Sequence, residues 1–307
     1  MRVFWFFTAA AFLYSQGPFS STPLGLDAFM PIPADNPPTA EKIALGRKLF
    51  FDMRLSRSQT IACATCHDAK RAFTDGRTVS EGVQGRLGTR NAPTLVNRGY
   101  GTAQFWDGRA ENLEEQVLRP IQDPNEMDMT LPEVAARLSI DSRTLAAALA
   151  TYIRTIRSGN SRVDQFLTRG DGLTPDEQLG LRVFRVKGNC VACHVGPNFT
   201  DERFHNTGIA WREGRYTDEG RSSVTAQPEE RGAFKTPTLR EAGRTAPYMH
   251  DGSIASLEEV IEHYDRGGVP NPQLDPEIRP LHLTPEEKRG LAAFLRALSG
   301  DISEGAH

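Results

Sequence analysis

Cysteine is scarce in this chain of 307 residues, with four in all, and no thiol remains outside two short motifs. Neither positive nor negative residues are in large excess, since the net charge is −3 and the pI is near 6.2. That balance excludes the basic surface expected of a nucleic-acid-binding protein. A mean hydropathy of −0.44 argues against membrane spans beyond the N-terminus. Few segments alternate between apolar and polar residues, so a β-rich fold is not expected.

All four cysteines belong to two Cys-x-x-Cys-His runs, which is the attachment signal for c-type haem. Two thioethers hold the porphyrin, and the adjacent histidine binds the iron. A redox dithiol has no need of the histidine, and a zinc site made from both runs would not need it twice. We therefore predict two covalently bound haem c groups and an electron-handling protein. The residues concerned are Cys63, Cys66, His67, Cys190, Cys193 and His194.

The N-terminus carries one positive charge at Arg2 and then a twelve-residue apolar run from Val3 to Tyr14. This run is too short to span a bilayer and is typical of a secretory signal peptide. A membrane anchor or a buried helix is the weaker interpretation, because no later segment is apolar enough to pair with it. We predict a signal peptide over residues 1–25, with cleavage between Ser15 and Leu26. Since c-type haem is attached outside the bacterial cytoplasm, a soluble periplasmic protein without stable membrane insertion is expected.

The two haem motifs lie in matching surroundings. Each is preceded by a Leu-Gly-x-x-x-Phe segment and followed by Phe-Thr-Asp, which predicts a duplicated cytochrome unit. Helix starts are indicated by capping residues. The fold expected is all-α, with two cytochrome-c-like domains at residues 26–165 and 166–307 and a boundary near 158–174; residues 212–230 are expected to form a long surface loop. The capping residues are Thr39, Asp141, Thr174, Ser256 and Thr284.

The face of each iron opposite its histidine decides what the haem can do. No His, Met or Tyr occurs from Asp68 to Arg90, so we expect the first iron to be open to a substrate. For the second iron, Tyr264 falls on the apolar face of a helix and points inward. A core tyrosine is the alternative role, and Met249 and His250 are rival ligands.

Several ordered segments resemble those of the bacterial dihaem cytochrome c peroxidases, over nearly the whole mature chain. They are residues 45–52, 63–77, 90–94, 105–109, 204–206, 235–240 and 247–252. The resemblance implies that the N-terminal haem reacts with peroxide. It also implies that Glu126 and Gln116 are the distal pair, because breaking the O–O bond requires a group that accepts and returns a proton. Pro120 matches a distal-pocket proline. Trp106 matches the tryptophan that relays electrons between the haems, a role compatible with a packed interface aromatic.

The same resemblance implies one calcium ion between the domains, held by the Asn91 side chain, the backbone carbonyls of Thr245 and Pro247, and waters. Two departures from the standard peroxidases stand out. The loop around Val83 has no displaceable histidine, and Tyr264 replaces an axial methionine. Both resemble the methylamine-utilisation (MauG) branch, in which tyrosine is the axial ligand and the first haem is permanently open.

Three functions follow as hypotheses. The first is a periplasmic peroxidase that reduces hydrogen peroxide with electrons from a small cytochrome c or cupredoxin. The second is a MauG-like oxidation of tryptophan on a partner protein through a bis-ferryl state, and the third is a simple electron carrier. The open first iron and Glu126 weigh against the carrier, and we favour the peroxidase. The resemblance further implies a homodimer.

Overall fold

The computed structural model describes residues 21–305, so most of the expected signal peptide lies outside the described residues. Within this range no helix has both the length and the apolar character needed to cross a membrane. The helices are α1 (Ala40–Phe50), α2 (Cys63–Cys66), α3 (Leu113–Gln116), α4 (Arg119–Gln122), α5 (Leu131–Leu138), α6 (Ser142–Arg154), α7 (Arg162–Arg169), α8 (Pro175–Arg185), α9 (Ser222–Thr225), α10 (Leu257–Asp265) and α11 (Pro285–Ala297).

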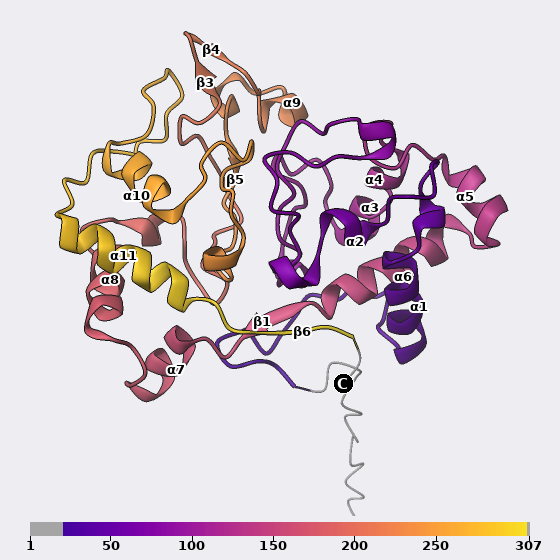
Figure 1. Ribbon diagram of the computed structural model, residues 1–307, viewed down its shortest axis with the longest axis horizontal. Helices are drawn as coiled ribbons and strands as arrows, with labels where there is room; N and C mark the ends of the chain where they lie inside the picture. The colour runs from indigo at the N-terminus through magenta and orange to yellow at the C-terminus, as the bar shows by residue number, and fades with distance from the viewer. Residues whose placement is uncertain (1–20, 306–307) are drawn as a thin grey trace, which may run out of the picture.

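Strands are few and short in the described residues, and each pairs with a single antiparallel partner. The strands are β1 (Arg157–Gly159), β2 (Phe204–His205), β3 (Trp211–Arg212), β4 (Arg215–Tyr216), β5 (Phe234–Lys235) and β6 (Asp301–Ser303); the pairs are β1 with β6, β2 with β5, and β3 with β4. Long loops join the helices and carry much of the chain (Figure 1). The fold is therefore one of helices and long loops, for which the term all-α is too narrow.

The helix starts follow from local side-chain chemistry. In each case the side-chain oxygen of the capping residue accepts a hydrogen bond from a backbone N–H of the first turn, which would otherwise lack a partner. At α8, α10 and α11 a glutamate at the third helical position also reaches back to the cap. The five predicted caps precede α1, α6, α8, α10 and α11.

The predicted duplication is visible in two helix pairs, α1 with α6 and α8 with α11. Gly46 and Gly180 sit where the helices of each pair approach most closely. A Cβ at Gly46 would lie 2.0 Å from the backbone oxygen of Ala148, and one at Gly180 would lie 1.9 Å from that of Gly290. Glycine is required at both positions, because any larger residue would force the helices apart.

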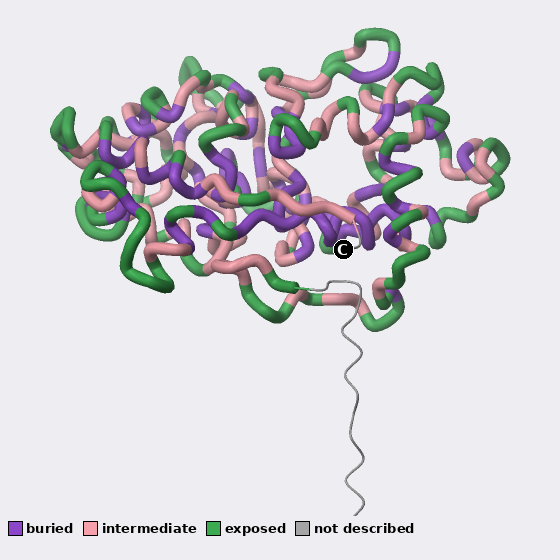
Figure 2. Tube along the Cα trace, turned by 60° about the horizontal axis from the view of Figure 1, so that its bottom comes forward, coloured by how far each residue is buried: buried purple, intermediate pink, exposed green. Residues whose placement is uncertain are grey.

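Two hydrophobic clusters form the interior, one from residues 43–156 and one from residues 163–298. Figure 2 shows buried segments inside both halves and exposed loops at the periphery. Segments near both ends of the chain contact the opposite half. Near the C-terminus, β6 pairs with β1, and Ile302 packs against the first cluster. The carbonyl of Gly25 accepts a 2.7 Å bond from Arg240 of the second half. The domain limits at 165 and 166 stay a prediction.

Two segments contain structure that the sequence analysis did not predict. The boundary region 158–174 includes part of β1 and the whole of α7, which Ser161 caps. The segment 212–230 is not one continuous loop, because Arg212 ends β3 of the β3–β4 hairpin and α9 follows. α7 carries local signals that the sequence analysis missed, because Ser161 and Asp164 form a capping box and Gly170 ends the helix. The β3–β4 hairpin and α9 are too short to show a hydrophobic period, so the three-dimensional contacts reveal them.

Charged pairs join the two halves. Arg90 donates to Asp107 at 2.6 Å within its own half and to Asp218 of the other half at 2.7 Å. Arg98 donates to Glu202 across the same interface at 2.8 Å. These side chains are mostly removed from solvent, so the two halves are held in one relative position by charge-assisted bonds.

Candidate haem and peroxide site

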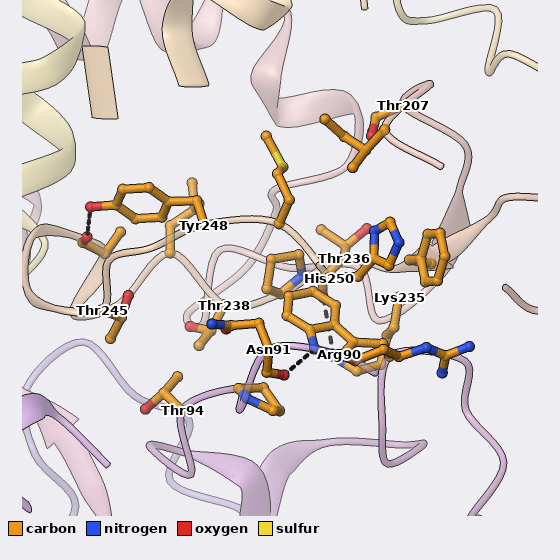
Figure 3. A pocket seen from close by; sticks show the side chains of 18 of the residues that line it. Arg90, Asn91, Thr94, Thr207, Lys235, Thr236, Thr238, Thr245, Tyr248 and His250 are labelled. Carbon is orange, nitrogen blue, oxygen red and sulfur yellow. Dashed lines mark hydrogen bonds between the residues drawn. The ribbon is translucent and has the colours of Figure 1, made fainter. Parts of the chain in front are cut away.

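One cavity of about 650 Å³ lies between the halves and is lined by residues from both haem motifs. Figure 3 shows Arg90 and Asn91 of the first half facing Lys235, Thr245 and His250 of the second across part of it. Its motif residues are Cys66, His67, Cys190, Cys193 and His194. The duplicated motifs therefore converge on a shared space instead of forming two remote sites.

Both motif histidines are oriented in the same way. Nδ1 of His67 lies 2.9 Å from the carbonyl oxygen of Phe73, and Nδ1 of His194 lies 2.7 Å from that of Phe199. A carbonyl only accepts, so each Nδ1 carries the hydrogen and each Nε2 has the lone pair that binds a metal. Burial lowers the pKa of both imidazoles, that of His194 to about 4. Neutral, oriented imidazoles beside paired cysteines on a large cavity fit haem c in both halves.

The repeated Phe-Thr-Asp segment explains this orientation. Phe73 and Phe199 both have positive φ values, 61° and 52°, which turn the chain so that each carbonyl meets its histidine. Their rings pack edge-on against Phe50 and Phe184 of the preceding helices, at 6.3 and 6.2 Å between ring centroids. The matching surroundings in the sequence are thus the supports of the two histidines.

Glu126 lies on the cavity wall at the turn that follows α4. Burial raises the pKa of its carboxyl to about 7, and the charge of Asp123 adds to this rise while Arg109 opposes it. At neutral pH the carboxyl and the carboxylate are therefore both populated. The sequence analysis assigned Glu126 only through the resemblance, and the structure places it in the environment that a proton-transfer group requires.

The loop at residues 82–86 packs directly against the Glu126 segment. The amide of Val83 donates to the carbonyl of Glu126 at 2.9 Å, and Arg86 donates to that of Pro124 at 2.6 Å. A Cβ at Gly82 would lie 2.1 Å from a backbone oxygen of the same segment. The loop therefore supports the backbone of Glu126, and the buried Val83 side chain offers no ligand to an iron.

Gln116 and Pro120 line the same cavity on either side of a helix interruption. α3 ends at Gln116, and α4 begins at Arg119 with Pro120 in its first turn. A proline has no N–H for the carbonyl four residues earlier, which here belongs to Gln116, and its ring crowds that carbonyl. Pro120 thus ends the helix that carries Gln116, whose side chain is expected to contact peroxide.

Trp106 lies between the two motif regions and is held by its backbone and its ring. Its Nε1–H donates to the carbonyl of Asn91 at 2.9 Å, and its own carbonyl accepts from the amide of Lys235 at 2.7 Å. A backbone carbonyl is a poor base, so the indole can lose an electron here while it keeps its proton.

Three candidates for the second axial ligand occupy different places. Tyr264 is on α10 at the cavity wall, where burial and the nearby sulfurs of Cys190 and Cys193 raise the pKa of its phenol. The His250 ring stacks on Phe234 with 3.6 Å between ring centroids. Met249 lines the cavity in a positive-φ turn. Tyr264 thus lies close enough to both cysteines of the second motif for their charges to act on its phenol, and its role as ligand stays a prediction.

The repeat extends beyond the haem motifs. The sequence analysis missed this extension. Residues 144 positions apart adopt the same local structure. Thr94 and Thr238 each donate from the hydroxyl to a backbone carbonyl at 2.6 Å, and Glu115 and Glu259 each accept from the amide four residues earlier at 3.0 Å. Further pairs at this spacing are Asn91 with Lys235, Phe105 with Met249, Trp106 with His250 and Pro120 with Tyr264.

Two of these pairs meet across the interface. The amide of Asn91 donates to the carbonyl of His250 at 2.7 Å, and the amide of Lys235 donates to that of Trp106 at 2.7 Å. The two bonds are equivalent in the repeat, so the halves are related by an approximate two-fold axis. In this correspondence Pro120 takes the place of Tyr264, and proline has no ligand atom. The first half therefore lacks a counterpart of Tyr264, the predicted axial ligand of the second half.

The residues expected to bind calcium, Asn91, Thr245 and Pro247, also line the cavity. Asn91 is 6% exposed, and its amide nitrogen donates to the carbonyl of Arg77 at 2.7 Å. This bond leaves the amide oxygen, the atom that calcium prefers, as the ligand. The three oxygen donors fit the ion, whose presence stays a prediction.

His205 is a site residue whose charge the sequence analysis did not address. Its ring lies between two carboxylates, 2.6 Å from Asp275 and 3.0 Å from Asp201, close to the sulfur of Cys193. The bond to Asp275 is the main reason that its pKa rises to about 11, so the imidazole stays protonated. The spacing of Asp201 and His205 was the one available signal; Asp275 is 70 residues away.

Comparisons with known proteins agree with this geometry. The family model of the dihaem cytochrome c peroxidases matches residues 40–172. The chain is 39% identical over 291 residues to the methylamine utilization protein MauG of Methylorubrum extorquens, covering 89% of this chain and 82% of that protein. It is 35% identical over 295 residues to the cytochrome c551 peroxidase of Nitrosomonas europaea, covering 90% and 85%.

A solved structure of a MauG-like protein associated with microbial copper homeostasis superposes with a TM-score of 0.83 at 34% identity, covering 90% of this chain and 95% of that one. Sequence, fold and site thus agree on two haem c cofactors and on peroxide chemistry. The chain belongs to the dihaem cytochrome c peroxidase/MauG family and is an oxidoreductase of the cytochrome c peroxidase type that acts on hydrogen peroxide.

Proposed function

We propose that the protein reduces hydrogen peroxide at the first haem, with electrons relayed through the second haem and Trp106 from a small redox protein such as cytochrome c or a cupredoxin. The observation that carries this proposal is Glu126, a carboxyl with a pKa of about 7 on the cavity of the haem motifs. When bound, the first haem supplies the iron at which the peroxide O–O bond breaks. The expected export signal and the haem c motifs support a periplasmic location.

The chain supplies the proton transfers. The carboxylate of Glu126 accepts a proton from the near oxygen of peroxide and returns it to the far oxygen, which leaves as water. A pKa near the working pH makes both steps accessible to one group. Gln116, on the same cavity, has an amide that can donate to the peroxide and orient it. With two electrons and two protons, one peroxide yields two waters.

Trp106 supplies the electron route between the halves. Its indole lies at the interface, fixed to Asn91, and its backbone is bonded to Lys235 of the second half. Because the indole N–H faces a carbonyl, electron loss is not coupled to proton loss and can be reversed quickly. A calcium ion held by the neighbouring Asn91 oxygen, with the carbonyls of Thr245 and Pro247, would keep this interface rigid.

A MauG-like activity is the second candidate, in which oxidising equivalents pass to tryptophan on a partner protein. Val83 and Tyr264 favour it, because they replace the displaceable histidine and the axial methionine of the standard peroxidases. A phenolate ligand stabilises oxidised iron, so a second haem with this ligand holds an oxidising equivalent better than a reducing electron. The relative named MauG belongs to this branch.

The fully oxidised protein should react with peroxide as isolated, because Val83 cannot occupy the first iron. The measurement is the Soret absorbance after peroxide is added to protein with both haems ferric. Reduced cytochrome c is then added: steady oxidation supports the peroxidase, and a spectral change without turnover supports the MauG-like candidate. A spectrum that stays constant until the protein is half-reduced would contradict an open first haem.

Replacing Tyr264 with phenylalanine should change the ferric spectrum of the second haem. The substitution removes the phenol oxygen and keeps the aromatic ring of this α10 residue. The matched control is Tyr248→Phe on the same cavity, because the hydroxyl of Tyr248 already donates to the carbonyl of Ala242 at 2.7 Å. If only the control variant alters the spectrum, or neither does, Tyr264 is not the ligand.

A further inference from the structure

A second, smaller cavity of about 310 Å³ adjoins the distal side of the first haem site. It shares Phe105, Pro120 and Glu126 with the large cavity, so the two spaces meet at the proton-transfer group. Its other wall residues include Arg119 and Gln122 on α4, both of which are exposed at the surface. The cavity thus connects solvent with the carboxyl of Glu126.

Both guanidinium groups along this wall are paired with carboxylates, and the carboxylate of Asp123 adds a negative charge to the wall. Arg109 lies over the Phe105 ring at 3.6 Å and donates to Asp107 at 3.0 Å. Arg119, the first residue of α4, is paired with Glu115 of α3. No guanidinium is left to hold an anion, so the wall favours passage of small uncharged molecules over capture of charged ones. The volume of about 310 Å³ is ample for several water-sized molecules.

We propose that this cavity is the access passage for peroxide, with Gln122 at its mouth and Glu126 at its inner end. The inference deepens the proposed function and rests on it, since it concerns the route to the same open haem. Gln122 is the last residue of α4, and its side-chain nitrogen donates to the carbonyl of Leu118 at 3.0 Å. The side chain therefore lies along the helix at the solvent end of the passage.

A blocked passage has a kinetic signature that differs from a damaged site. A ligand must cross the passage in both directions, so an obstruction slows association and dissociation by the same factor and leaves the dissociation constant unchanged. A change in the haem pocket alters the stability of the complex and therefore the dissociation constant. Cyanide, which is uncharged as hydrogen cyanide at neutral pH, is the probe, and the haem-loaded ferric protein is the sample.

In the Gln122→Trp variant we expect cyanide association and dissociation to slow by an equal factor of about ten or more, with an unchanged resting spectrum, and the reaction with peroxide to slow by a similar factor. Gln122→Ala should not slow either rate, because it removes bulk at the same position. Gln227→Trp, on the exposed turn after α9, should behave like the wild type.

Three outcomes overturn the passage while the wild type still binds cyanide: unchanged rates in Gln122→Trp, equal slowing in Gln122→Ala, or a changed dissociation constant. A wild-type ferric protein that binds neither cyanide nor peroxide would contradict the proposed function itself, and the passage with it. The two failures are therefore distinguished by the wild-type measurement alone.

Discussion

The Glu126→Gln variant is expected to react with peroxide about 10²- to 10⁴-fold more slowly than the wild type, which is the usual contribution of a positioned acid–base group. Glutamine keeps the size of the side chain but cannot accept and return a proton. The measurement is the rate of the Soret change after rapid mixing of ferric protein with peroxide. Haem content and the resting spectrum should stay unchanged, because Glu126 does not attach either haem.

The pH profile gives this prediction a second test. Burial raises the pKa of Glu126 to about 7, so the carboxyl is protonated below that pH and cannot accept a proton from peroxide. The wild-type rate should therefore rise as the pH increases through about 7 and level off above it, and the step should vanish in Glu126→Gln. Glu111→Gln, at an exposed position, is the matched control. A glutamine variant that keeps the wild-type rate and pH step would rule out this role.

Replacing Pro120 with tyrosine should close the first iron. In the repeat Pro120 occupies the place of Tyr264, so a tyrosine there should carry a phenol oxygen toward the first haem, as we predict that Tyr264 does toward the second. We expect the spin-resonance signal of the open ferric haem to be replaced by that of a fully ligated one, and both cyanide binding and the peroxide reaction to be lost.

The Pro120→Ala variant separates the ligand from the helix. Alanine removes the proline break between α3 and α4 but supplies no ligand atom, so the first iron should still bind cyanide. If alanine closes the iron as tyrosine does, the helix break and not the missing ligand keeps it open. If tyrosine leaves cyanide binding intact, the correspondence between Pro120 and Tyr264 does not extend to the irons.

Much of the structure follows from local chemistry, and this portion was predictable. A cap is a contact between residues three positions apart, so Thr174 and Thr284 announce their helices in the sequence itself. The haem motifs are equally local, because the cysteines and histidine of each act within five residues. The repeated Phe-Thr-Asp segments were noticed because they are also close to the motifs in the chain, but their role as supports of the histidines appears only in the structure.

The remainder depends on contacts between distant residues. The pairing of β1 with β6 joins residues about 140 positions apart, and neither strand has a pattern of its own. The burial that raises the pKa of Glu126 comes from packing that no local pattern records, including the loop at Val83. The repeat at 144 positions was missed although the sequence signals it: Pro-Thr-Leu at 93–95 and 237–239, Asp-Gly at 107–108 and 251–252, and Leu-Glu-Glu at 113–115 and 257–259 recur at this spacing. The haem motifs themselves are 127 positions apart, so a search at their spacing does not align these runs.

The approximate two-fold axis between the halves has a consequence for the difference that we predict between the two irons. Two separate copies of one cytochrome, joined by the reciprocal amide-to-carbonyl bonds at Asn91 and Lys235, would form an ordinary symmetric dimer. In such a dimer every substitution appears twice, so a proline that frees one metal would free the other as well. Fusion into one polypeptide removes that constraint, which allows a vacant centre and a capped centre to share a single scaffold.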